Sequence, residues 1–171
     1  NGAAVRVAPI ALWMRSTDEE ETANAARASA IPTHAHPAAI HGAVGVALVL
    51  RRLLEGATRD AATAALEGWE DLARGSPDLS PQEAYEQYGH GVVIEETVPA
   101  AVWAFLGARS FDGALARVVA LGGDTDSIGA IVGAFAGAHF GFEAIRPVCV
   151  DALEKTACAT VERFIERLAR R

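Results

Sequence analysis

Residues 122–139 read GGDTDSIGAIVGAFAGAH, and this stretch carries most of the information about the fold. Its second part, from residue 128 onward, has no Asp, Glu, Lys or Arg and places Gly129, Gly133 and Gly137 four positions apart. Small residues at that spacing share one face of a helix and let neighbouring backbones approach closely. The stretch therefore predicts a buried helix whose small-residue face holds the acidic end rigidly.

The rest of the chain has the same helical character. Apolar residues recur every three or four positions, and no stretch alternates with a period of two for long enough to predict a strand. Hydrophobic residues make up 51% of the 171 residues but aromatic residues only 6%, so small side chains carry the apolar content. Because such a composition favours closely packed helices, we expect an all-α protein of one domain.

Caps, prolines and glycines predict the helix boundaries. We expect roughly nine helices in total. They include helices over residues 5–14, 37–55, 58–74, 99–108 and 112–121, one opened by a Ser16–Glu19 capping box and ending near Ala30, a short one opened by a Ser80–Glu83 capping box, and a last one with Val161, Phe164, Ile165 and Leu168 on one stripe.

Charge and cysteine content exclude several classes of protein. The net charge is −7, from 15 basic and 22 acidic residues, which argues against a broad electrostatic grip on nucleic acid or an anionic membrane. The apolar stretch 128–142 is shorter than the ~20 residues that span a bilayer. Cys149 and Cys158 stand nine positions apart without a Cys-x-x-Cys pair. We interpret them as buried free thiols of a cytoplasmic protein.

Two carboxylates and two hydroxyls occupy residues 124–127. At a helix start, Asp124 and Asp126 can turn toward one point, where their oxygens suit Mg²⁺ or Mn²⁺. The alternative is that Asp124 or Thr125 only caps the helix while Asp126 complements its dipole. A cap needs one acidic residue and no paired glycine before it, so the whole pattern favours a metal site.

The segment GGDTDS with its Gly/Ala helix resembles the second metal-binding motif of the ADP-ribosylglycohydrolases, a family that includes the dinitrogenase reductase-activating glycohydrolases. Three further segments resemble the family in the same order. They are NGAAVRVAP at residues 1–9, with Val5 in place of the usual Met, Thr33-His34 before a long helix, and residues 91–103, which include ETVPAA at 96–101.

The resemblance implies a compact orthogonal multi-helix bundle, of which residues 1–171 form the C-terminal portion of a single domain. It implies that Asp124, Asp126 and Ser127 bind two Mg²⁺ ions, with Mn²⁺ as the alternative. The family has Thr or Ser at the last of these positions. Asn1 and Gly2 would belong to the loop that holds ADP-ribose, and His34 would contact the phosphates.

The implied activity is hydrolysis of the glycosidic bond at the anomeric carbon of ADP-ribose on a protein side chain, arginine or serine. Asp124 and Asp126 would act through the metal. The family's first metal motif and its catalytic carboxylate belong to an N-terminal half that is absent here, so we expect a half-site that is inactive without that partner. The alternative is a catalytically silent ADP-ribose-binding or crystallin-like structural relative.

Other candidate residues have simpler interpretations. A zinc site from His34, His36 and His41 is disfavoured because their spacing straddles a loop and Pro37 and no cysteine joins them. His36 is expected to cap the following helix. The remaining residues are interpreted structurally: Glu95 and Glu96 as an acidic stretch that favours a helix dipole, and Trp13, Trp69 and Trp103 as core.

Overall fold

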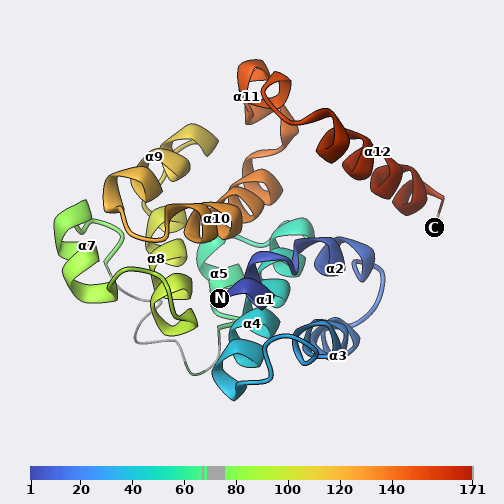
Figure 1. Ribbon diagram of the computed structural model, residues 1–171, viewed down its shortest axis with the longest axis horizontal. Coiled ribbons are helices and arrows are strands. Elements are labelled where there is room, and N and C mark those ends of the chain that lie inside the picture. The colour runs from blue at the N-terminus through green and yellow to red at the C-terminus, as the bar shows by residue number, and fades with distance from the viewer. Residues whose placement is uncertain (67, 69–75, 171) are drawn as a thin grey trace.

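The computed structural model describes residues 1–66, 68 and 76–170. These residues form eleven α-helices, one 3-10 turn and no strand, which confirms the all-α prediction (Figure 1). In chain order the elements are α1 (Gly2–Val5), α2 (Ala8–Trp13), α3 (Glu19–Ala30), α4 (Pro37–Leu54), α5 (Arg59–Thr63), α7 (Pro81–Tyr88), α8 (Ile94–Leu106), α9 (Phe111–Leu121), α10 (Thr125–Phe140), η1 (Phe142–Ala144), α11 (Pro147–Asp151) and α12 (Lys155–Ala169).

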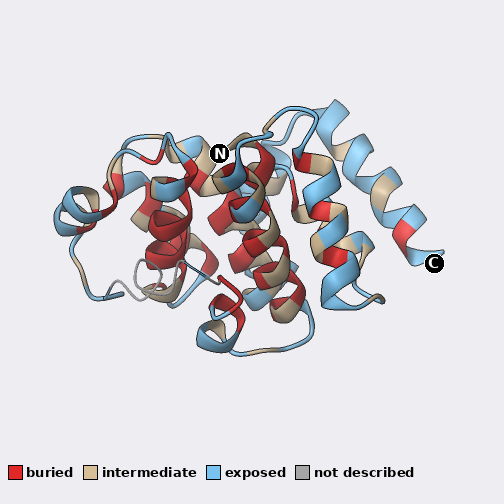
Figure 2. Ribbon diagram, turned by 90° about the horizontal axis from the view of Figure 1, so that it is seen from below, coloured by how far each residue is buried: buried red, intermediate tan, exposed pale blue. Residues whose placement is uncertain are grey.

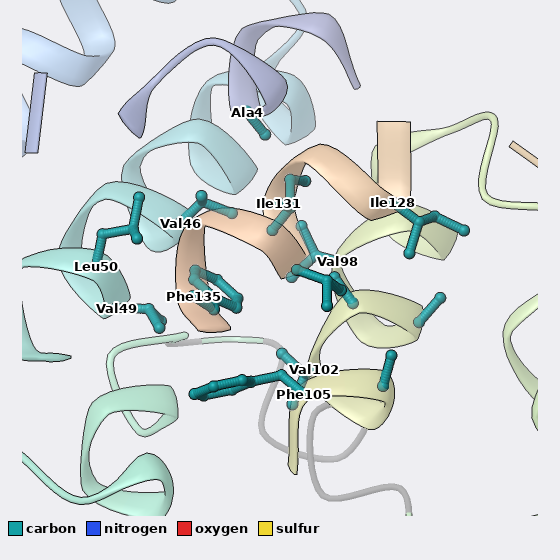
Figure 3. Packing of buried hydrophobic residues seen from close by; sticks show 14 of the residues in the cluster. Ala4, Val46, Val49, Leu50, Val98, Val102, Phe105, Ile128, Ile131 and Phe135 are labelled. Atoms are coloured by element: carbon teal, nitrogen blue, oxygen red, sulfur yellow. The ribbon is translucent and has the colours of Figure 1, made fainter. Parts of the chain in front are cut away.

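Helices α4, α8 and α10 enclose the core. Helix α10 lies centrally, with α7, α8 and α9 on one side and α1 to α4 on the other (Figure 1). Side chains from all three core helices point toward one another, among them Val46, Val98 and Ile131 (Figure 3). Helix α4 is long and apolar enough to cross a membrane, but 56% of it is buried inside the fold, as expected of a central core helix.

The aromatic side chains that were expected in the core are found there only in part. The rings of Phe105 and Phe135 lie 5.5 Å apart and are fully buried. Trp103 is also buried, and its indole N–H donates to the carbonyl of Leu79 at 3.2 Å, so its core assignment is confirmed. Trp13 is 38% exposed, so its assignment to the core was wrong. Trp69 lies outside the described residues.

Several helix boundaries agree with the capping patterns. The Ser80–Glu83 capping box is present in both directions, Ser110 caps α9, and α4 begins at Pro37. His36 accepts the N–H of Ala38 at 3.3 Å, so it caps α4 as predicted. The starts of these helices are therefore set locally, by side chains that satisfy the first free backbone N–H groups.

At the N-terminus the predicted boundaries are wrong in two places. The helix expected over 5–14 is two helices, α1 and α2, because Pro9 has no N–H to continue the ladder from α1. Asp18, not Ser16, caps α3: its carboxylate accepts the N–H of Glu21 at 2.7 Å. The carboxylate directly before the helix therefore caps it in place of the expected Ser16–Glu19 capping box.

Two further helices differ from their predicted lengths. Helix α5 begins after its cap residue Thr58, close to the predicted start, but ends at Thr63, whose hydroxyl donates back to the carbonyl of Arg59. The rest of the predicted 58–74 helix reaches into residues outside the described part. Helix α8 begins at Ile94, not at Pro99, because the carbonyl that Pro99 leaves free belongs to exposed Glu95 and can bind water.

The small-residue face of α10 was expected to pack closely against neighbouring backbones, but it does not. A Cβ added at Gly133 or Gly137 would meet no atom within 4 Å, and one at Gly129 would lie 3.9 Å from Val118. Gly133 and Gly137 instead border an open apolar groove of about 260 Å³. This groove is lined by Ala8, Leu12, Leu50, Leu54, Gly133, Ala134, Gly137 and Ala138.

The C-terminal helices α11 and α12 project from the core and are mostly exposed (Figures 1 and 2). The ring of Phe164 lies 6.2 Å from that of Trp13, which anchors α12 to α2. Both cysteines are free, but Cys149 is exposed and Cys158 partly exposed, so the expected burial was wrong. Their helices have no second layer of the described chain over them.

Candidate metal and phosphate site

The acidic segment follows a glycine turn that is pinned to a second loop. Gly122 and Gly123 have φ of 83° and 70°, a conformation that side chains rarely adopt. A Cβ on Gly123 would lie only 2.3 Å from the carbonyl oxygen of His90, and the N–H of Asp124 donates to that same oxygen at 2.8 Å. The first turn of α10 is therefore fixed against the loop before α8.

The carboxylate of Asp124 gathers hydrogen bonds from separate parts of the chain. Its Oδ2 accepts the side-chain N–H of Asn1 at 2.6 Å. Asp126 and Ser127 lie within hydrogen-bonding reach of the same carboxylate. Partial burial raises the pKa of Asp124, but its polar contacts with Asp126, Asn1 and Ser127 outweigh this effect and hold the pKa below its ordinary value. The ionised form is thus favoured.

Asp124 occupies the N-cap position of α10 and Asp126 stands in its first turn, but the Asp124 side chain forms no capping hydrogen bond. The backbone N–H of Ser127 faces the Asp124 carboxylate, but without the geometry of a capping hydrogen bond. Thr125 is already the first residue of α10 and does not cap it. The ion pairs of the described chain join Arg51–Glu55, Arg52–Glu19 and Arg146–Asp112, so no arginine neutralises either aspartate. The two carboxylates and one hydroxyl form one edge of a possible cation site.

That edge alone is not a complete metal site. Within residues 1–66, 68 and 76–170, no group of three or more His, Cys, Asp or Glu side chains is arranged to hold a metal ion. A Mg²⁺ ion takes six oxygen ligands in near-octahedral geometry. The oxygen chemistry of Asp124, Asp126 and Ser127 fits such an ion, and the number of ligands falls short.

Thr97 was not identified from the sequence, although it is central to the site. Its side chain is fully buried, its hydroxyl donates to the carbonyl of Gly91 at 2.5 Å, and it lies 3.3 Å from the side-chain nitrogen of Asn1. Asn1 also donates to the carbonyl of Gly91, at 3.0 Å. Thr97 stands inside the segment 91–103, between Glu96 and Val98, and no spacing in the sequence marks it as a site residue.

The residues expected to meet the diphosphate also lie together. A Cβ on Gly2 would sit 2.9 Å from Nε2 of His34, so the imidazole lies directly over the backbone of Gly2. Asn1, the neighbour of Gly2, donates to Asp124. The structure therefore brings the five positions Asn1, Gly2, His34, Asp124 and Asp126 into one continuous region.

A wide cleft of about 700 Å³ opens beside Asp124. It is lined by His90, Val92, Val93, Glu96, Gly123 and Asp124. Glu95 and Glu96 stand in the first turn of α8, which agrees with their structural interpretation. Glu96 also accepts the N–H of Gly91 at 2.9 Å and so fixes the loop that Asp124 binds.

Comparisons with known proteins identify a family and similar chains. The family model described as ADP-ribosylglycohydrolase matches residues 1–171. An uncharacterized protein of Archaeoglobus fulgidus is 34% identical over 80% of this chain and 48% of its own length. The ADP-ribosylhydrolase ARH3 of Mus musculus is 28% identical over 85% of this chain and 50% of its own length.

A solved structure is similar as well. A chain titled "ADP-ribosylglycohydrolase-related protein complex" superposes with a TM-score of 0.76 and 31% identity, over 99% of this chain and 59% of that one. The present chain thus spans about half the length of the curated relatives that it matches.

Proposed function

The chain belongs to the ADP-ribosylglycohydrolase family, and from this membership we propose that it is part of a metal-dependent hydrolase that removes ADP-ribose from modified protein side chains. The bond cleaved would be the glycosidic bond at the anomeric carbon, on arginine or serine. Relatives named as ADP-ribosylhydrolase ARH3 and ADP-ribosylarginine hydrolase Tri1 support this class of substrate.

One observation carries the proposal: the Asp124 carboxylate lies beside the Asp126 carboxylate and the Ser127 hydroxyl at the leading end of α10, without an arginine partner in the described chain. Such hard oxygen ligands suit two Mg²⁺ ions, or Mn²⁺. When bound, the ions would supply the positive charge that orients the ribose hydroxyls and the attacking water.

The chain's own residues would hold the substrate around these ligands. Asn1 fixes the Asp124 carboxylate through its 2.6 Å hydrogen bond, and the adjacent backbone of Gly2 leaves room for the imidazole of His34. His34 would donate to the diphosphate, which an acidic protein must hold locally. Asp124 and Asp126 would take part in catalysis only through the ions.

We further propose that residues 1–171 are the C-terminal portion of one domain and that an N-terminal half supplies the remaining ligands and the acid and base. Three observations support this. The ligand set is incomplete, the chain spans about half of its relatives, and the open apolar groove and the exposed side of α12 offer surfaces for further helices to cover.

The first experiment measures Mn²⁺ affinity by isothermal titration in the longest polypeptide that contains this chain. The variant Asp124→Asn should weaken binding by more than about tenfold, because a neutral amide replaces an anionic ligand. Asp151→Asn is the matched control, since it removes the same charge from an exposed position on α11. Equal Mn²⁺ affinities in the two variants would contradict the proposal that Asp124 binds a metal ion.

The second experiment titrates ADP-ribose with and without Mg²⁺ and assays its release from ADP-ribosylated arginine and serine peptides. Metal-dependent binding with release of ADP-ribose is the expected result. Binding without release from either peptide would favour the catalytically silent alternative. Release that persists in Asp124→Asn would contradict the role assigned to this carboxylate.

A further inference from the structure

Arg6, Thr33 and His34 form a chain of hydrogen bonds beside the proposed diphosphate site. Arg6 Nη2 donates to the hydroxyl oxygen of Thr33 at 2.5 Å and to the carbonyl of Ser29 at 2.8 Å. The same Thr33 oxygen lies 2.8 Å from Nδ1 of His34. The guanidinium of Arg6, at the end of α1, therefore joins the end of α3 to the loop before α4, and the Thr33 hydroxyl extends this chain to His34.

The chemistry of these groups fixes the direction of the Arg6–Thr33 hydrogen bond and favours one direction for the bond between Thr33 and His34. A guanidinium group can only donate, so the oxygen of Thr33 accepts from Arg6. The hydroxyl proton of Thr33 then needs an acceptor, and Nδ1 of His34 is within reach. A neutral imidazole that accepts at Nδ1 carries its proton on Nε2.

Nε2 is the ring nitrogen that faces Gly2, 2.9 Å from the place where a Cβ would be. A proton on this nitrogen lies on the side of the ring that faces Gly2, and Asn1, the neighbour of Gly2, donates to Asp124. We propose that Arg6 and Thr33 are positioning residues that hold neutral His34 as an Nε2–H donor for the diphosphate of ADP-ribose. This inference rests on the proposed function, which supplies the ligand.

A merely structural role makes a different prediction. If the bonds of Arg6 only tie α1 to the end of α3, substitutions should lower the melting temperature and leave the tautomer of His34 unchanged. If Arg6 instead binds the phosphate directly, its loss should weaken ligand binding, again without a change at the imidazole. The state of the His34 ring separates these cases.

The test is nitrogen NMR of His34 in the longest polypeptide that contains this chain, at about pH 8.5, where a free imidazole is neutral. In the wild type, Nε2 should carry the proton and Nδ1 should show the shift of a hydrogen-bonded acceptor. Thr33→Val should move Nδ1 toward the shift of a free acceptor and admit the second tautomer, whereas Thr33→Ser should keep the wild-type spectrum. Arg6→Leu should also change it.

Affinity for ADP-ribose provides the second measurement. Thr33→Val should weaken binding by about tenfold, the effect of one misdirected hydrogen bond to a charged group, and Thr33→Ser should restore it. A protonated Nδ1 in the wild type overturns the inference without any variant, even if ADP-ribose binds. The expected spectrum in a protein that does not bind ADP-ribose overturns the proposed function instead.

Discussion

Helices α10 and α12 have similar lengths, but their apolar side chains differ in burial. Helix α10 has weak amphipathic character, with glycine and alanine around most of its circumference, yet Ile128, Ile131 and Phe135 are almost completely buried. Helix α12 has a clear apolar stripe, yet only Leu168 is buried, while Val161 and Ile165 are 54% and 56% exposed. Figure 2 shows the contrast between the central helices and the projecting one.

This difference shows that a periodic apolar pattern predicts a helix and its preferred face, but not the partner of that face. Hydrophobic burial is proportional to the area that another element covers. Helix α10 is covered by α4, α8 and α9, whereas α12 meets the described chain mainly through Phe164 and Trp13. The predictions below test how strongly stability follows coverage.

The largest effect is expected at the centre of α10. Phe135→Ala should lower the free energy of unfolding by about 3–5 kcal/mol, because it leaves a cavity next to the ring of Phe105. Urea denaturation measures this change. Phe135→Leu, which keeps most of the volume, should cost less than half as much; a cost below about 1 kcal/mol for the alanine variant would refute tight burial here.

A smaller effect is expected at the turn that leads into α10. Gly123→Ala should lower the free energy of unfolding by about 1–3 kcal/mol, because φ is 70° and the new Cβ would collide with the carbonyl of His90. Gly133→Ala is the matched control on the open side of the same helix. It should stabilise the protein by about 0.5–1 kcal/mol, since the added methyl meets no atom within 4 Å.

In α12 the effect should be within about 0.5 kcal/mol for Ile165→Ala, because this side chain is mostly exposed. Leu168→Ala, one turn away but buried, is the matched control and should cost more. Thermal unfolding of the two variants in parallel decides the point. A large loss for Ile165→Ala would mean that α12 is covered in solution by something beyond the described chain.

The smallest effect concerns pH at the end of α10. Partial burial, and then the nearby charge of Arg59, hold the pKa of His139 below its ordinary value. The unfolded chain therefore takes up this proton first, so the free energy of unfolding should fall as pH drops below about 6.5 and should not change through this group above that range. Because the ring is largely exposed, solvent screening keeps the effect small.

Comparison with His139→Gln isolates this contribution. Below about pH 6.5 the wild type should lose unfolding free energy relative to the variant. Above that pH the difference between the two proteins should stay constant. Denaturation curves recorded from pH 5 to 8 would show it. Parallel pH profiles would mean that the imidazole titrates alike in both states.

Local sequence patterns predicted much of the fold because they act within one turn of a helix. Ser80 with Glu83, Ser110 and Pro37 each set a helix start through neighbours three residues away or fewer. The predictions failed where two local signals competed, as at Asp18 and Ser16, or where the carbonyl that a proline leaves free belongs to an exposed residue, as at Pro99.

The residues of the candidate site could be predicted from the sequence to a similar extent. Asp124, Asp126 and Ser127 stand together in the sequence, and their grouping at a helix start follows from helix geometry. Thr97, Arg6 and Thr33 could not be assigned from their spacing, because their roles depend on hydrogen bonds to residues up to 96 positions away. Only the folded chain brings those partners within reach.

The sequence by itself determined the all-helical class, most helix starts and the acidic segment, since each depends on interactions between neighbours along the chain. The tertiary structure decided which apolar faces are covered, why Asp124 is fixed to Asn1 and the loop at His90, and which nitrogen of His34 faces Gly2. The reason is physical: burial and long-range hydrogen bonds depend on how elements pack in three dimensions, and the periodicity of one element does not contain that information.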